Sequence, residues 1–169
     1  MEKTTHELKT ISPAAIPRAL QKAERYRLLN QSWATESICL DILEVDPGNQ
    51  QVLVMLLLSL TDQFGAEPGD LTRRARSLLS RLTDKYQQLY YTGIIDERLG
   101  HAKLAHTAMH AEAIAYRSFR TAMTAYEQAA DIRTQGNDDA LLRWNTCART
   151  IERLHLTEDT ETYEPVFGE

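Results

Sequence analysis

The sequence predicts an all-α fold, and three observations support this prediction. Only 7 glycines and 5 prolines occur among the 169 residues, and four of the prolines lie near the edges of predicted helices. Residues 19–49 contain two short amphipathic stretches, separated by a break at residues 30–32 and closed by Asp46 and Pro47. Most of the remaining chain has apolar residues at helical spacing and few helix-breaking residues, which favours helix over sheet.

The first half of the chain predicts three helices. The first covers about residues 16–30, and Pro17 lies in its first turn, where the missing N–H costs little. The second covers about residues 33–45 after Ser32, a plausible N-cap. The third, at about residues 50–63, is apolar almost all round, which is typical of a helix buried between neighbours.

The middle of the chain predicts two more helices after a loop at residues 65–69. Asp70 can cap the fourth helix, which covers about residues 70–84. The fifth covers about residues 86–99, and Gly100 is placed to end it.

The C-terminal part predicts one long helix and one shorter helix. Residues 102–134 contain no glycine or proline and many alanines, so one continuous helix is expected, with a break near Arg117 and Ser118 as the alternative. A last helix is expected at about residues 138–154. We therefore expect about seven helices in all.

The sequence divides the chain into three parts, and the charge distribution sets the last of them apart. We expect a loose N-terminal lead-in at residues 1–15, a helical domain at residues 16–154 and an acidic, extended or disordered tail at residues 155–169. The tail contains five acidic residues and no Lys or Arg, so the other 19 acids balance all 19 basic residues. A neutral body gives no general electrostatic reason to bind nucleic acid.

The chain has no apolar segment of the length that a membrane span or a secretory signal needs. Its two cysteines, Cys39 and Cys147, lie on predicted helices and are interpreted as small buried hydrophobic residues, not as a disulfide. A cytoplasmic protein without a membrane partner is expected.

The first helix pair resembles a tetratricopeptide repeat. Ala23 stands at the small-residue position, Tyr26 matches the tyrosine, and Pro47 closes the unit at the expected distance, although Cys39 replaces the usual aromatic residue. Farther along, Ala122, Tyr126 and Ala129 match the signature of a second helix, but the repeat spacing slips after residue 100. The resemblance implies a right-handed stack of antiparallel helix pairs, in which the first helix of each pair lines a concave groove.

The resemblance also implies which residues line this groove. These positions are Gln21, Glu24, Arg27, Tyr90, Tyr91, Ile94 and Arg98. Glu24 stands where a carboxylate-binding clamp of the family would have Asn, so that clamp is not expected.

The histidines give a different possible chemistry. His106 and His110 are four residues apart and would share one face of the long helix, so they could bind a metal, with His101 nearby and Glu97 or Glu112 as a carboxylate. The alternative is that these histidines are solvent-facing or hydrogen-bonded. Similarly, the arginines between Arg73 and Arg81 indicate either a solvated helix face or a site for an acidic peptide.

No catalytic motif occurs in the sequence, so an enzyme is not expected and no cofactor is required. The sequence instead predicts a scaffold or interaction module that binds a peptide or helix of a partner protein in a groove. The alternative is a small metal-binding protein that uses His106 and His110. A homo-oligomer is also possible, as is binding of the tail segment from Tyr163 to Phe167 to the groove of its own or a neighbouring chain.

Overall fold

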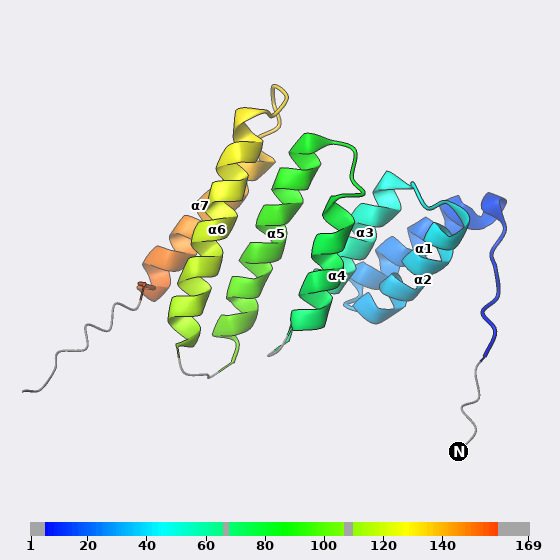
Figure 1. Cartoon of the computed structure of the whole chain (residues 1–169), viewed down its shortest axis with the longest axis horizontal. Helices are drawn as coiled ribbons and strands as arrows, with labels where there is room; N and C mark the ends of the chain where they lie inside the picture. Colours follow the sequence, from blue (N-terminus) through cyan, green and yellow to red (C-terminus); the bar gives the residue numbers. More distant parts are fainter. Residues whose placement is uncertain (1–5, 66–67, 107–109, 159–169) are drawn as a thin grey trace, which may run out of the picture.

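The computed structural model describes residues 6–65, 68–106 and 110–158, and helices make up most of them (Figure 1). The predicted tail lies mostly outside these residues, as does its segment from Tyr163 to Phe167. In chain order the elements are η1 (Pro13–Ala15), α1 (Ile16–Leu28), α2 (Ser32–Val45), α3 (Gln50–Thr61), α4 (Gly69–Leu79), α5 (Lys85–Leu104), α6 (Ala111–Asp131) and α7 (Asp139–Leu154).

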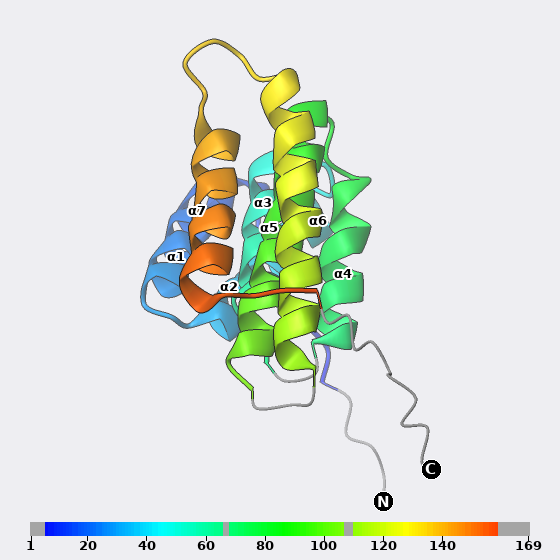
Figure 2. The same ribbon diagram turned by 90° about the vertical axis from the view of Figure 1, so that its left-hand side faces the viewer.

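The seven α-helices of the described residues form a row that runs from α1 at one end to α7 at the other (Figure 1). Each helix packs against the next, and α3 also contacts α1 and α5. Figure 2 shows α7 on one side and α4 and α6 on the other, with α3 and α5 between them. No strand occurs in the described ranges, so the all-α prediction is confirmed. None of the described helices is long and apolar enough to cross a membrane.

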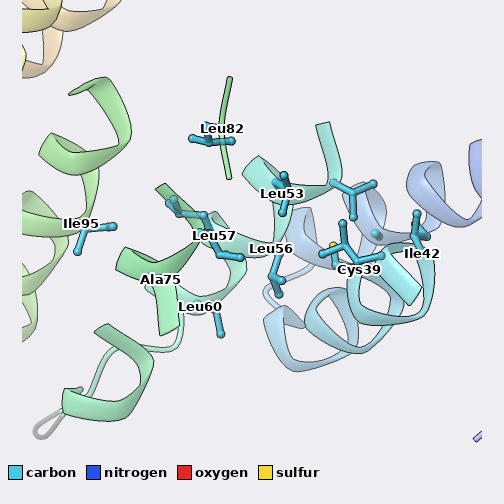
Figure 3. Packing of buried hydrophobic residues seen from close by; sticks show 13 residues of the cluster. Cys39, Ile42, Leu53, Leu56, Leu57, Leu60, Ala75, Leu82 and Ile95 are labelled. Carbon is cyan, nitrogen blue, oxygen red and sulfur yellow. The ribbon is translucent and has the colours of Figure 1, made fainter. Parts of the chain in front are cut away.

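The N-terminal half of the row is held by a core centred on α3. In Figure 3, the leucines of α3 lie between Cys39 and Ile42 of α2 on one side and Ala75, Leu82 and Ile95 on the other. Leu53 and Leu57 are completely buried, and burial of each such side chain contributes about 1.5–3 kcal/mol. The nearly all-apolar sequence of α3 therefore reflects a helix with neighbours on most sides.

Both cysteines are buried and free. Burial, reinforced by the nearby carboxylates of Glu36 and Glu97 respectively, raises the pKa of Cys39 and of Cys147 to about 12. These thiols therefore stay protonated at neutral pH, as expected of small core residues.

The predicted continuous helix over residues 102–134 is wrong. Helix α5 continues past Gly100 to Leu104, and α6 begins at Ala111 after His110, whose φ is +61°. The alternative break at Arg117 and Ser118 is also wrong, since α6 runs through both. Alanine favours a helix at every position, so composition alone could not locate the reversal, which lets α5 and α6 bury their apolar faces against each other.

Gly100 does not end α5 because it has a packing role inside the helix. A Cβ atom on Gly100 would lie 2.9 Å from Cε1 of Phe119, and one on Gly93 would lie 2.7 Å from Cδ1 of Tyr126. Both pairs are seven residues apart on their helices, so two glycines of α5 face two completely buried aromatic rings of α6. This contact lies in the most extensive helix–helix interface of the described chain.

This packing predicts that Gly93→Ala destabilises the protein. Alanine is the better helix former by about 1 kcal/mol, but its methyl group would collide with the Tyr126 ring and overpack the interface, which typically costs about 1–3 kcal/mol or more. Chemical denaturation should therefore show a lower free energy of unfolding. Gly69→Ala in the first turn of α4 is the matched control, since beyond its chain neighbours and its own helix backbone no described atom lies within 4 Å of the position that the new methyl group would take, and it should leave stability equal or slightly higher. If Gly93→Ala and Gly69→Ala changed the free energy of unfolding equally, the close packing of Tyr126 on Gly93 would be contradicted.

Candidate functional site

Three helix ends meet at an ion cluster made by Arg27, Asp62 and Arg98. Arg27 lies in the last turn of α1, Asp62 directly follows α3, and Arg98 lies in the second half of α5. Arg27 Nε donates to Asp62 Oδ2 at 2.7 Å, and Arg98 Nη1 donates to the other carboxylate oxygen, Oδ1. Each side chain keeps roughly a fifth to a quarter of its surface exposed, so the cluster fixes the two guanidinium groups and leaves them accessible.

The cluster lies in an open cavity of about 570 Å³. Besides the three charged residues, the cavity is lined by Leu28, Asn30, Ser32, Thr61, Phe64, His101, Ala102 and Ala105. Both polar and apolar groups line its walls, and Leu28 is 83% exposed. This combination of fixed cations and exposed apolar surface can hold both the polar and the apolar parts of a ligand.

A buried polar cluster lies behind one wall of the cavity. Glu97 is only 3% exposed, and its Oε2 accepts a hydrogen bond of 2.6 Å from the Tyr126 hydroxyl, while Arg143 Nη1 donates to Oε1 at 3.1 Å. A buried carboxylate is costly unless it is paired, and here α6 and α7 each supply one donor to it. Glu97 therefore ties the three C-terminal helices together.

His101 connects this cluster to the cavity. Its Nε2 lies 4.0 Å from Glu97 Oε1, and its ring meets the Phe119 ring edge-on at a centroid distance of 5.0 Å. Partial burial lowers the pKa of His101 below 6.5, an effect that the Glu97 carboxylate partly opposes and nearby arginines reinforce. The imidazole is therefore neutral at physiological pH and lines the cavity as an uncharged polar group.

The structure brings together two of the residues expected in the groove, Arg27 and Arg98, through Asp62. Gln21 is exposed and Glu24 is half-buried, and both lie on α1 outside this cavity. Ile94 is completely buried in the C-terminal core beside Phe119 and Tyr126.

Tyr90 and Tyr91, also expected in the groove, belong to a group of half-buried rings. Tyr90 stacks on Tyr86 at a centroid distance of 5.8 Å, meets Tyr91 edge-on at 5.2 Å and lies 5.8 Å from Tyr126. Burial, together with the neighbouring Tyr90, raises the pKa of Tyr91. These contacts give the rings a packing role between α5 and its neighbours, with partial exposure that still leaves surface for a ligand.

The structure removes the geometric basis of the proposed histidine site. Because α5 ends at Leu104 and α6 begins at Ala111, His106 and His110 do not share the face of one helix. No group of three His, Cys, Asp or Glu side chains suited to holding a metal ion occurs among residues 6–65, 68–106 and 110–158.

The arginines of α4, and Arg81 just after it, each have a partner in the described part of the chain. Arg73 pairs with Asp70, Arg74 with Glu36 and Arg76 with Asp96, while Arg81 donates to the Pro47 carbonyl at 2.8 Å. Sequence reasoning singled out this group but missed the basic residues of α1, namely Arg18, Lys22 and Arg25. The signal was present in their spacing of four and three residues, which places them on one helix face.

With this geometry in view, comparisons of the chain with protein-family models, with curated proteins and with solved structures found no match.

The buried polar cluster around Glu97 predicts how the pKa of His101 responds to replacement of Glu97. In the native protein, NMR should give a pKa below 6.5, and Glu97→Gln should lower it further, because the neighbouring carboxylate that stabilises the imidazolium is removed. Glu44→Gln, on the exposed surface of α2, is the control and should leave the titration unchanged.

The lowered pKa of His101 also makes the stability of the fold depend on pH. A lowered pKa means that the fold favours neutral His101, so its contribution is complete above pH 6.5 and is lost as the pH falls through the folded-state pKa. A His101 pKa above 6.5 would contradict the placement of this side chain.

Proposed function

We propose that this chain is an interaction module of the tetratricopeptide type that binds an extended segment of a partner protein across the C-terminal ends of α1, α3 and α5. The observation that carries the proposal is the cavity of about 570 Å³ between these three helices, with Arg27 and Arg98 fixed on its floor by Asp62. Helices α1, α3 and α5 are the first members of three consecutive antiparallel pairs, and the family resemblance places the binding groove on such helices.

The chemistry of the cavity suits a peptide backbone with a polar and an apolar anchor. Each guanidinium has five N–H donors, and Asp62 occupies only part of them, so Arg27 and Arg98 can also donate to carbonyl or carboxylate oxygens. Because Asp62 already holds both side chains, binding costs little further side-chain entropy.

Exposed apolar side chains continue from the cavity around the turn between α1 and α2. Leu28 lines the cavity, Leu29 is exposed directly after α1, and Trp33 is exposed in the first turn of α2. Large exposed apolar side chains next to a polar cavity are common at protein interaction sites, where a few anchors supply most of the binding energy.

Selection from a displayed library of random peptides tests this proposal without a known partner. Peptides enriched on the native protein should bind at least about tenfold more weakly to Leu28→Ser and to Arg98→Ala, because each variant removes one kind of anchor. Leu142→Ser is the matched control: this leucine is 63% exposed on α7, away from the cavity, and its loss should leave binding unchanged. Enrichment of no peptide, or equal losses with the control, would contradict the proposed site. Circular dichroism of each variant checks that the fold is retained.

A further inference from the structure

Helix α1 presents a basic face whose charges have no carboxylate partner among the described residues. Arg18, Lys22 and Arg25 are exposed, and none forms an ion pair within that part of the chain. They surround a surface depression of about 530 Å³ that Gln21 and Tyr26 also line. The Lys22 ammonium lies 5.7 Å from the centre of the Tyr26 ring, so the face combines cations with an aromatic surface.

This face differs from the other arginine-rich helix. The exposed arginines of α4 are neutralised by Asp70, Glu36 and Asp96, so α4 offers little unbalanced charge. It also differs from the cavity described above: Arg27, nine residues after Arg18, lies on the opposite side of α1 and pairs with Asp62.

The chain itself contains a segment with the complementary composition. Residues 159–169 include four acidic residues (Asp159, Glu161, Glu164 and Glu169), no basic residue, and two aromatic side chains at positions 163 and 167. Since the other parts of the chain are formally balanced, this segment and the preceding Glu158 carry the whole net charge of −5.

We propose that the basic face of α1 in one chain binds residues 159–169 of a second copy. The acidic side chains pair with Arg18, Lys22 and Arg25, and the aromatic residues of the segment contact the depression beside Tyr26. This contact is independent of the proposed function, because it uses a different face of α1.

Geometry favours a second copy over the chain's own tail. Helices α1 and α7 lie at opposite ends of the row (Figure 1). Leu156, just after α7, is buried in the C-terminal core with Phe119 of α6, which fixes the point from which the tail departs. From residue 158, the six residues that end at Glu164 span at most about 21 Å when fully extended. The distance from α7 past α5 and α3 to α1 is three helix spacings of about 9 Å each, or about 27 Å, and the outer face of α1 lies beyond that. Asp159, Glu161 and Glu164 of the same chain therefore cannot reach the basic face.

An acidic segment at one end and a basic face at the other give a head-to-tail contact. Such a contact is heterologous, so it leads to rings or open chains instead of stopping at a symmetric pair. It depends on exposed charges, so salt should weaken it.

Light scattering of the full chain across a range of protein concentrations tests the inference. The average mass should rise with concentration at low salt and fall again when about 0.5 M salt is added. The variant Arg18→Glu with Lys22→Glu and Arg25→Glu should stay monomeric under the same conditions. The control variant, Lys85→Glu with Arg117→Glu and Arg120→Glu, reverses three exposed charges elsewhere and should associate as the native chain does.

A synthetic peptide of residues 159–169 identifies the contact. Added in excess, it should dissociate the assembly, and its fluorescent form should bind the control variant at least about tenfold more tightly than the α1 variant. A matched peptide with Asn and Gln in place of the acids should do neither. A chain that is monomeric at every concentration, or an assembly that the α1 variant retains, would overturn the proposal. The two proposals can fail separately. If the α1 variant stops associating but the native protein still enriches peptides, this contact and the cavity are both supported; if the chain associates as expected but enriches no peptide, only the proposed function of the cavity is contradicted.

Discussion

The close approach of α5 to α6 is the constraint on which the C-terminal half of the structure depends. Gly93 and Gly100 leave the α5 backbone bare on one face, and the rings of Tyr126 and Phe119 occupy the space that two Cβ atoms would fill. Both rings are completely buried, so the contact combines large apolar burial with a fixed distance between the helix axes. No other pair of described helices has so extensive an interface.

The same contact determines where the charged groups of α5 lie. Tyr126 packs against Gly93 and also donates its hydroxyl hydrogen to Glu97, one turn farther along α5. Glu97 then accepts from Arg143 of α7, so packing and charge pairing reinforce each other across three helices. With this face of α5 fixed, Arg98 and His101 are left to line the cavity, next to Asp62 and Arg27. The position of the cavity therefore follows from packing on the far side of α5.

Local patterns in the sequence were sufficient to predict the helices of the first half, because amphipathic spacing, Pro17 and Pro47 indicate where they lie. The predicted N-cap Ser32 is wrong, since Ser32 is the first residue of α2 and Gln31 precedes it without a side-chain cap. Local patterns failed at residues 102–134, where alanine supports helix everywhere and only tertiary packing selects the reversal. Gly100 was misinterpreted for the same reason: a glycine at a helix end and a glycine under an aromatic ring look alike in sequence.

Among the site residues, Arg27 and Arg98 followed from the repeat resemblance. Asp62 could not, since nothing local marks a residue whose partners lie 35 and 36 positions away. Likewise, sequence could not distinguish the paired arginines of α4 from the basic residues of α1, which have no carboxylate partner in the described part of the chain.

A double-mutant cycle on Gly100 and Phe119 tests the central packing claim most directly. Gly100→Ala and Phe119→Leu should each lower the free energy of unfolding, the first by overpacking and the second by leaving a cavity. Combined, the smaller leucine makes room for the new methyl group, so the double variant should be more stable than the sum of the two losses predicts, by about 0.5–3 kcal/mol. Strictly additive losses in denaturant titrations would show that the two residues do not share this space, and would contradict the packing of α5 on α6 described above.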